Sequence, residues 1–202
     1  MAKTKNTPLL IFRKDERGDY IITIKEVRLM FEHVHKPWSK TEAEDKKYSG
    51  RFLLDPKKHA KEIEILQEFN ESLRLEYFKG AKLKPDAYYF RDGDNEGQAD
   101  FEDHWVIAAS EKATHKPAVI GRDKRPITAE DDLVYSGAFV NVQIKPWKQD
   151  NKHGKKINAN LIAVQFFEKG EKVSGSGGVS KEVIDEGFDE YEAPEDDGFG
   201  DD

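Results

Sequence analysis

The clearest pattern of hydrophobic and polar positions along this 202-residue chain lies between residues 137 and 147, where the two kinds alternate. Successive side chains of a β-strand point to opposite faces, so a period of two predicts a strand with one buried face. The apolar face consists of Ala138, Val140, Val142 and Ile144. The opposite face consists of Phe139, Asn141, Gln143, Lys145 and Trp147. We expect the first set in the core and the second at the surface.

Further short segments are rich in β-branched, aromatic and apolar residues and are bounded by turn-forming residues, which predicts more strands. They are Tyr20–Phe31, Tyr48–Leu54, Ala87–Phe90, His104–Ser110, Pro117–Gly121 and Lys156–Glu168. In the last segment the alternating apolar residues are Ile157, Ala159, Leu161 and Ala163. The charged segments His33–Lys47 and Lys148–Lys155 predict loops, the second being a glycine-containing hairpin loop.

One segment has the period of a helix rather than a strand. Apolar residues recur at spacings of three and four, at Ile63, Leu66, Phe69, Leu73 and Tyr77. Asp55 followed by Pro56 is a typical helix start, and Gly80 ends the run. We expect one amphipathic helix packed on a sheet, with its aromatic residues in the core. Thr128 and Asp131 have the spacing of a capping box, which predicts a helical turn before Tyr135.

These elements together predict a mainly β fold, an antiparallel β-barrel of the oligonucleotide-binding (OB) type with one long α-helix. Residues 1–18 form a basic N-terminal arm, residues 19–173 the domain, and residues 174–202 a flexible linker and a disordered acidic tail. A length of 202 residues suits one domain with appendages.

Charge is divided unevenly between the body and the tail. Of the 40 Asp and Glu residues, 11 lie in residues 182–202, which leaves 29 against 33 Lys and Arg in residues 1–181. The body therefore carries about +4 and the tail −11, although the net charge of the whole chain is −7. A basic body favours a polyanionic partner such as nucleic acid.

Several classes of protein are excluded by what the sequence lacks. There is no cysteine, which excludes disulfides and cysteine-based catalysis and fits a reducing, intracellular compartment. No apolar run is long enough for a signal peptide or a membrane span. Motifs for binding nucleotides or for activating a nucleophile are also missing. We therefore expect a soluble protein that is not an enzyme and that needs no cofactor or metal.

Basic and aromatic residues are interleaved in three clusters on or beside the predicted strands. Binding single strands without reading sequence needs cations for the phosphates and rings on which bases stack, at about 1–3 kcal/mol per base. The first cluster is Lys145, Lys148, Lys152, Lys155 and Lys156 with Trp147 and Phe139. The second is Lys116, Arg122, Lys124 and Arg125 with Tyr135. The third is Lys46, Lys47 and Arg51 with Tyr48 and Phe52.

An ordinary solvated face explains any single cluster equally well, since lysine-rich hairpins are common on soluble proteins. Three clusters with interleaved rings favour nucleic-acid binding over that interpretation. Trp147 and Trp38 have proline and lysine neighbours and are harder to explain as core residues than Trp105, which precedes the apolar segment 106–109.

Acidic and histidine residues offer an alternative in the form of a metal-dependent nuclease. Asp92 and Asp94 could bind a cation with a histidine, and His33 and His35 could share one face of a strand. The sequence Asp92-Gly93-Asp94 is equally simple turn chemistry, and solvated histidines explain the other pair. We favour these structural interpretations.

Five ordered segments carry a resemblance to a known family. They are residues 47–59 (KYSGRFLLDPKKH), 90–94 (FRDGD), 115–128 (HKPAVIGRDKRPIT), 134–144 (VYSGAFVNVQI) and the return strand 154–161. Over most of residues 20–178 the chain resembles the phage single-stranded DNA-binding proteins long catalogued as a domain of unknown function. The resemblance implies an OB-fold, DNA binding in replication or recombination, and an acidic tail that contacts partner proteins.

The tail differs from those of the better-known bacterial single-strand binders, which end on an aromatic residue. Here Phe199 is followed by three more residues, which argues against a pocket for a terminal phenylalanine but keeps an electrostatic role. We expect Phe188, Tyr191 and Phe199 to contact replication or recombination proteins.

The sequence thus predicts a protein that coats single-stranded DNA in the cytoplasm of an infected bacterial cell. A strand-annealing recombination mediator is the alternative within this class, and an adaptor whose acidic tail mimics nucleic acid is an alternative outside it. The choice between monomer and homodimer stays open.

Overall fold

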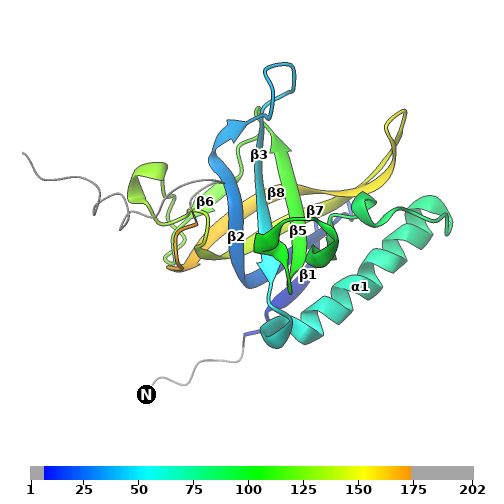
Figure 1. Ribbon diagram of the computed structural model, residues 1–202, viewed down its shortest axis with the longest axis horizontal. Helices are drawn as coiled ribbons and strands as arrows, with labels where there is room; N and C mark the ends of the chain where they lie inside the picture. The colour runs from blue at the N-terminus through cyan, green and yellow to red at the C-terminus, as the bar shows by residue number, and fades with distance from the viewer. Residues whose placement is uncertain (1–6, 174–202) are drawn as a thin grey trace, which may run out of the picture.

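The structure is a computed structural model that describes residues 7–173, and it consists mainly of β-strands (Figure 1). The strands are β1 (Leu10–Lys14), β2 (Tyr20–Trp38), β3 (Lys47–Leu54), β4 (Phe90–Asp92), β5 (Trp105–Lys112), β6 (Ala118–Ile120), β7 (Phe139–Asn151) and β8 (Gly154–Glu168). The helix α1 (Pro56–Phe78) follows β3, and four 3₁₀ turns lie at Pro85–Ala87, Gly93–Asn95, Ala99–Phe101 and Ala129–Asp131.

Strand pairing closes the sheet on itself. The order along the sheet is β4-β5-β3-β2-β7-β8-β6, and a parallel bridge between Ser110 of β5 and Asn160 of β8 joins its two sides. Within residues 7–173, β2, β3, β5, β8 and β7 therefore form a ring of five strands, as in the OB-fold. The predicted mainly β, OB-like fold is confirmed, and the strand β1 pairs with β2 outside the ring.

The core fills the inside of this ring. Val140, Val142 and Ile144 of β7 are fully buried, whereas Phe139, Asn141 and Gln143, which alternate with them, are half-buried, as predicted. In β8 the inward face carries Ile157, Ala159 and Leu161. The pattern then shifts by one residue, because a β-bulge opposite Gln143 and Ile144 brings Val164 rather than the predicted Ala163 into the core.

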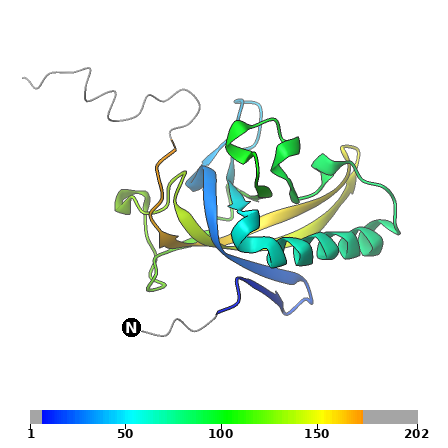
Figure 2. The same ribbon diagram turned by 60° about the horizontal axis from the view of Figure 1, so that its bottom comes forward.

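The helix α1 runs along the outside of the ring, beside the β1–β2 hairpin (Figures 1 and 2). It begins as predicted, with the Asp55 carboxylate accepting a hydrogen bond from the Lys57 backbone amide and Pro56 in the first turn. Its apolar side buries Ile63, Leu66, Leu73 and Phe78. Phe69 contacts the rings of Phe12 and Tyr20 in the hairpin, with centroid distances of 4.9 Å in each pair.

Three predicted boundaries are wrong. The strand β2 continues through residues predicted as a loop and ends at Trp38. The predicted hairpin loop Lys148–Lys155 is mostly strand, because β7 and β8 pair up to Asn151 and Gly154 and leave a turn of Lys152 and His153. Residues 85–87 form a 3₁₀ turn, so β4 begins at Phe90 rather than at Ala87.

The capping box at Thr128 and Asp131 is present and starts a short 3₁₀ turn, as predicted. No helix in residues 7–173 has the length and apolar character needed to cross a membrane. The linker and the acidic tail of residues 174–202, with Phe188, Tyr191 and Phe199, lie outside the described residues.

Candidate nucleic-acid interface

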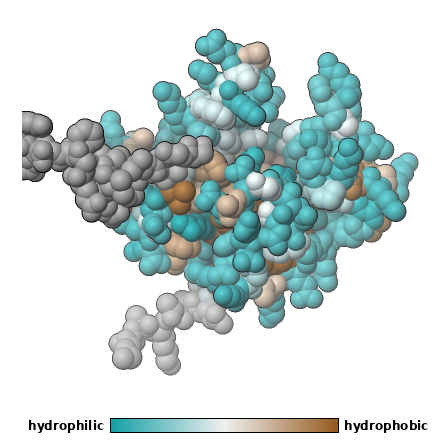
Figure 3. Space-filling model, in the orientation of Figure 1, coloured by the Kyte–Doolittle hydropathy of each residue, from teal (hydrophilic) through white to brown (hydrophobic). Residues whose placement is uncertain are grey.

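A groove crosses the outer face of β3 and β5. It consists of two adjoining hollows of about 800 and 840 Å³ that share Trp38, Lys40, Ser49 and Arg51. Residues of the β2–β3 loop line one side of the first hollow, and His153 and Lys156 of the β7–β8 hairpin line another. Both hairpins project beyond the ring in Figure 1. The surface around them is mainly hydrophilic, with small separate hydrophobic areas (Figure 3).

Arg51 lies in the floor of this groove. Its neighbours across β3 and β5 are small, since Arg51 faces Ala108 and Ser49 faces Ser110, so the guanidinium has room to lie along the sheet. Burial lowers the pKa of Arg51, although an arginine stays charged at neutral pH. Within residues 7–173 no carboxylate forms an ion pair with it. A partly desolvated cation without an anionic partner is suited to a phosphate.

Arg91 adds a second guanidinium to the first hollow. It forms an ion pair with Glu96 and donates a hydrogen bond of 2.7 Å to the Tyr88 carbonyl. Burial, and secondarily the positive charge of Arg51, lowers the pKa of Arg91. Glu96 therefore offsets the charge of Arg91, while Arg51 stays available.

Trp38 provides the most exposed aromatic ring at the groove and lines both hollows. Its exposed fraction is 52%, and its indole stacks on the imidazole of His33 with a centroid distance of 4.9 Å and an angle of 10°. Burial lowers the pKa of His33, so the ring beneath Trp38 is neutral at neutral pH. The stack fixes one indole face and leaves the other for a base.

Phe31 provides a second ring in the other hollow. Its backbone has a φ of 49°, in the left-handed region that a bulky residue rarely adopts. The β-bulge between Met30 and His33 accounts for this conformation. It turns Phe31 outward, where its ring meets Phe101 edge to face at 5.6 Å.

Three of the predicted cationic residues line the groove: Lys47, Arg51 and Lys156. Trp147 lies close by on the same surface. It is opposite Asn158 in the β7–β8 ladder, and opposed residues of an antiparallel pair share a face. Asn158 lines the groove, and Trp147 is 39% exposed, so the predicted outward position of this ring is confirmed.

Tyr48 and Phe52, predicted to stack on bases, are core residues. Tyr48 is 8% exposed and Phe52 is fully buried. Strand alternation explains the correction, because Lys47, Ser49 and Arg51 point outward and the residues between them point into the ring.

Lys145 is also used differently from the prediction. Its ammonium lies 2.8 Å from Asp15 and 2.6 Å from Asp19, carboxylates of the turn between β1 and β2. The hydrogen bonds that its ammonium donates to these carboxylates raise the pKa of Lys145, and its charge is neutralised locally. We infer that Lys145 fastens this turn to β7 rather than serving as a free phosphate ligand.

Outside the groove lining, Lys46 and Lys116 are exposed in the segments just before β3 and β6, and the remaining predicted cations lie in two places. Lys148, Lys152 and Lys155 lie at the β7–β8 hairpin tip, where Lys148 and Lys155 approach the Phe78 ring. The second cluster lies toward the other end of the ladder, where Phe139 pairs with Glu168. There Arg122 donates to the Phe167 carbonyl, Arg125 pairs with Asp123, and Tyr135 donates to the Gly170 carbonyl; Lys124 is exposed.

The acidic residues of the nuclease alternative accept hydrogen bonds from backbone amides. Asp92 accepts a hydrogen bond from the Asp94 amide, and Asp94 accepts one from the Asp103 amide. These bonds agree with the turn interpretation. Within residues 7–173 no three His, Asp or Glu side chains are grouped to hold a metal ion. His33 and His35 are half-buried rather than solvated, and His33 is used in the Trp38 stack.

Five strands close into a ring, and aromatic side chains and cations gather in a groove on its outer face. These are the features of OB-fold proteins that bind single-stranded nucleic acid. A sequence model of the family described as "Enterobacter phage Enc34, ssDNA-binding protein" matches residues 20–198, and the chain belongs to this family. The family resemblance predicted from the sequence is thereby confirmed.

Individual relatives are similar over most of the chain. Protein p50 of Acyrthosiphon pisum secondary endosymbiont phage 1 is 30% identical over 174 residues, which are 82% of this chain and 92% of that protein. The single-stranded DNA-binding protein from bacteriophage Enc34, solved in complex with ssDNA, is 28% identical with a TM-score of 0.69. That match covers 82% of this chain and 98% of the solved chain. A second structure of the Enc34 protein is 27% identical with a TM-score of 0.68, covering 87% and 98%.

Proposed function

We propose that the protein binds single-stranded DNA, with bases stacked on Trp38 and Phe31 and phosphates held by Arg51, Lys47 and Lys156. The observation that carries this proposal is the unpaired guanidinium of Arg51 beside the exposed Trp38 ring in one groove. Neither stacking nor phosphate contact reads a base sequence, so binding is largely independent of sequence. The relationship to the Enc34 protein, which is solved with ssDNA, supports the proposal.

Salt dependence tests the phosphate part of the proposal. Each phosphate neutralised on a single strand contributes about −0.7 to the slope of log affinity against log salt, so Lys47, Arg51 and Lys156 together account for about −2. We expect each of Lys47→Met, Arg51→Met and Lys156→Met to reduce the steepness by about 0.7 in oligonucleotide titrations.

The matched control for these variants is Lys61→Met, an equal charge change at an exposed position of α1 outside the groove. It should leave the salt slope unchanged. Equal slopes in all four variants would contradict the assignment of phosphates to the groove.

The role in the infected cell follows from this binding. We propose that the protein coats transient single strands during phage DNA replication or recombination, in the bacterial cytoplasm, and that it is not an enzyme. Strand annealing is the second candidate role, because a protein that removes hairpins from two complementary strands also prepares them to pair. A measured acceleration of annealing at coating concentrations would favour the mediator role.

The acidic tail is proposed to act as an internal competitor. Residues 182–202 carry 11 carboxylates and follow the Ser- and Gly-rich segment 174–178, which keeps them at high effective concentration near a basic body. We expect deletion of residues 182–202 to raise ssDNA affinity at low salt, with a gain that shrinks as screening shortens the field to about 8 Å at physiological ionic strength. Affinity titrations of the full-length and truncated proteins at two salt concentrations measure this gain.

Equal affinities of the two proteins at low salt would mean that the tail only confers solubility. If the tail is displaced by DNA, Phe188, Tyr191 and Phe199 become available to replication or recombination proteins when the groove is occupied. Both a monomer and a homodimer are compatible with this proposal.

A further inference from the structure

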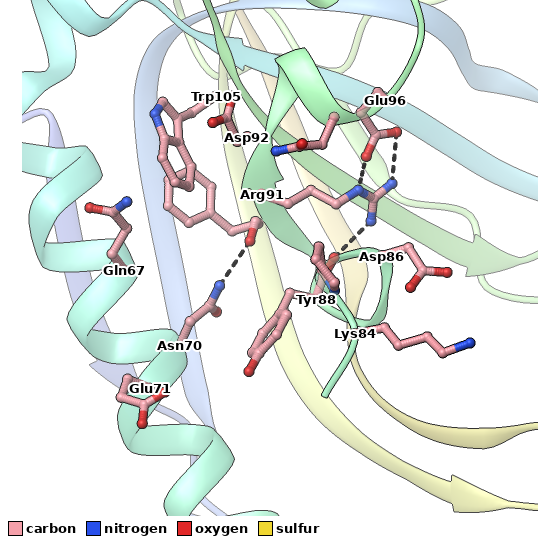
Figure 4. A pocket seen from close by; sticks show the side chains of 13 residues that line it. Gln67, Asn70, Glu71, Lys84, Asp86, Tyr88, Arg91, Asp92, Glu96 and Trp105 are labelled. Carbon is pink, nitrogen blue, oxygen red and sulfur yellow. Dashed lines mark hydrogen bonds and ion pairs between the residues drawn. The ribbon is translucent and has the colours of Figure 1, made fainter. Parts of the chain in front are cut away.

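A second cavity, of about 580 Å³, adjoins the groove between α1 and the segment that leads into β4 (Figure 4). Four residues, Asp86, Tyr88, Arg91 and Glu96, line both the cavity and the groove. A strand that follows the groove therefore passes the mouth of this cavity. Phosphate binding and stacking on Trp38 make no use of it.

The cavity contains a buried polar atom without a partner. Asn70 on α1 is 7% exposed, and its Nδ2 donates a hydrogen bond of 2.9 Å to the Phe90 carbonyl. This bond fixes the orientation of the amide, because a flipped amide would place two oxygens against each other. The Asn70 Oδ1 then faces the cavity and accepts no hydrogen bond from any described residue (Figure 4). A buried acceptor left unpaired is costly, so a group that donates an N–H or O–H to it is favoured at this place.

The walls of the cavity suit a flat ring. Phe90 and Trp105 pack against each other at 5.0 Å with an angle of 32°, and the ring of Tyr88 lies across from α1 (Figure 4). Besides Asn70 Oδ1, carboxylates outnumber cations in the lining, with Glu71, Asp86, Asp92 and Glu96 against Lys84 and Arg91. Arg91, the nearest guanidinium, is paired with Glu96. Such a lining favours a ligand edge that donates N–H groups. It disfavours an edge that presents a carbonyl oxygen, and it repels a phosphate.

We propose that this cavity receives one nucleobase of the bound strand and prefers a base with an exocyclic amino group, such as cytosine, over thymine. The proposal rests on the proposed single-strand binding and adds a base preference at one position. The phosphates of that nucleotide stay outside, near Arg51, because the acidic lining repels them. Apolar walls with hydrogen bonds to a base edge are the usual features of a pocket for an unstacked base.

The test compares three oligonucleotides of equal length, about 12 nucleotides, made of dC, dT or deoxyuridine. The cytosine amino group donates two N–H hydrogens where thymine and uracil present a carbonyl oxygen and have a single N–H donor, at N3; uracil also lacks the thymine methyl group. At mildly alkaline pH, where cytosine is unprotonated, we expect dC to bind about two- to tenfold more tightly than dT, the effect of one hydrogen bond. Deoxyuridine should bind like dT.

Gln67→Trp is the variant that tests the cavity, because Gln67 is an exposed residue of α1 that lines it and an indole there would fill its mouth. The matched control is Ser72→Trp, an uncharged and exposed position on the same helix outside the cavity lining. Gln67→Trp should lose the dC preference while its affinity for dT changes less than about twofold, and Ser72→Trp should keep the preference. Thermal unfolding verifies that both variants are folded.

Two results would overturn the base pocket while leaving the proposed function intact. One is equal affinity of the unmodified protein for dC and dT, and the other is a dC preference that persists in Gln67→Trp. Tight binding of deoxyuridine, equal to that of dC, would also overturn it, because the preference would then reflect the thymine methyl group. Failure to bind any of the three oligonucleotides would refute the proposed function and the pocket together.

Discussion

Phe52→Ala is expected to lower the free energy of unfolding by about 3–5 kcal/mol, the usual cost of truncating a fully buried phenylalanine. Phe52 has no exposed surface and belongs to the main hydrophobic core. An added Cβ at Gly50 would meet both Phe52 and Leu29 at 3.0 Å, which indicates tight packing around the ring. Urea unfolding of the variant and the unmodified protein measures the difference.

The neighbouring Arg51 is the control for this prediction, since it lies on the opposite face of the same strand. Arg51→Met should weaken ssDNA binding with little change in unfolding free energy, whereas Phe52→Ala should bind normally per folded molecule. If Phe52→Ala weakened DNA binding without loss of stability, Phe52 would be a stacking residue after all.

The two faces of β3 show how much of the site can be predicted from the sequence. The sequence predicts this segment as a strand, and the clusters of cations and rings assign Lys47, Arg51, Tyr48 and Phe52 all to DNA. Adjacent residues of a strand point to opposite faces, so Arg51 and Phe52 cannot both face one ligand. Strand alternation therefore separates Lys47 and Arg51 from Tyr48 and Phe52. The charged pair must face outward, because burying unpaired charges is costly.

The prediction of β7 is correct because all the residues of one face are small or aliphatic, whereas those of the other face are aromatic, amide or cationic. Its hairpin to β8 was missed because the extended arms have the composition of a loop, with lysine, asparagine and aspartate. These arms project beyond the core, so backbone pairing between β7 and β8 rather than burial holds them. Gly154, with a φ of 98°, permits the tight turn.

The groove itself was beyond prediction because its parts come from distant segments. The sequence marked Trp38 as hard to explain in a core, but it placed His33–Lys47 in a loop. Two positive-φ residues, Glu26 and Phe31, let β2 bend and continue to Trp38. Only the pairing of β2, β3 and β5 then brings Phe31, Trp38 and Arg51 together.

Trp38→Ala is expected to reduce ssDNA affinity by about 1–3 kcal/mol, or about five- to 150-fold, the contribution of one base stacked on an aromatic ring. The indole is 52% exposed and rests on His33, so its loss should leave the unfolding free energy nearly unchanged. Fluorescence anisotropy of a labelled oligonucleotide measures the affinity, and urea unfolding measures the stability.

Three variants separate stacking from other effects of losing the ring. Trp38→Phe keeps a ring and should recover part of the affinity, while Leu75→Ala removes an equally exposed apolar side chain from α1 and should have no effect. Trp147→Ala should weaken binding less than Trp38→Ala, because Trp147 is outside the residues that line the groove and lies one strand beyond it. A greater loss of affinity in Trp147→Ala would show that the DNA strand passes nearer to β7. An unchanged affinity in Trp38→Ala would show that Trp38 is not part of the interface.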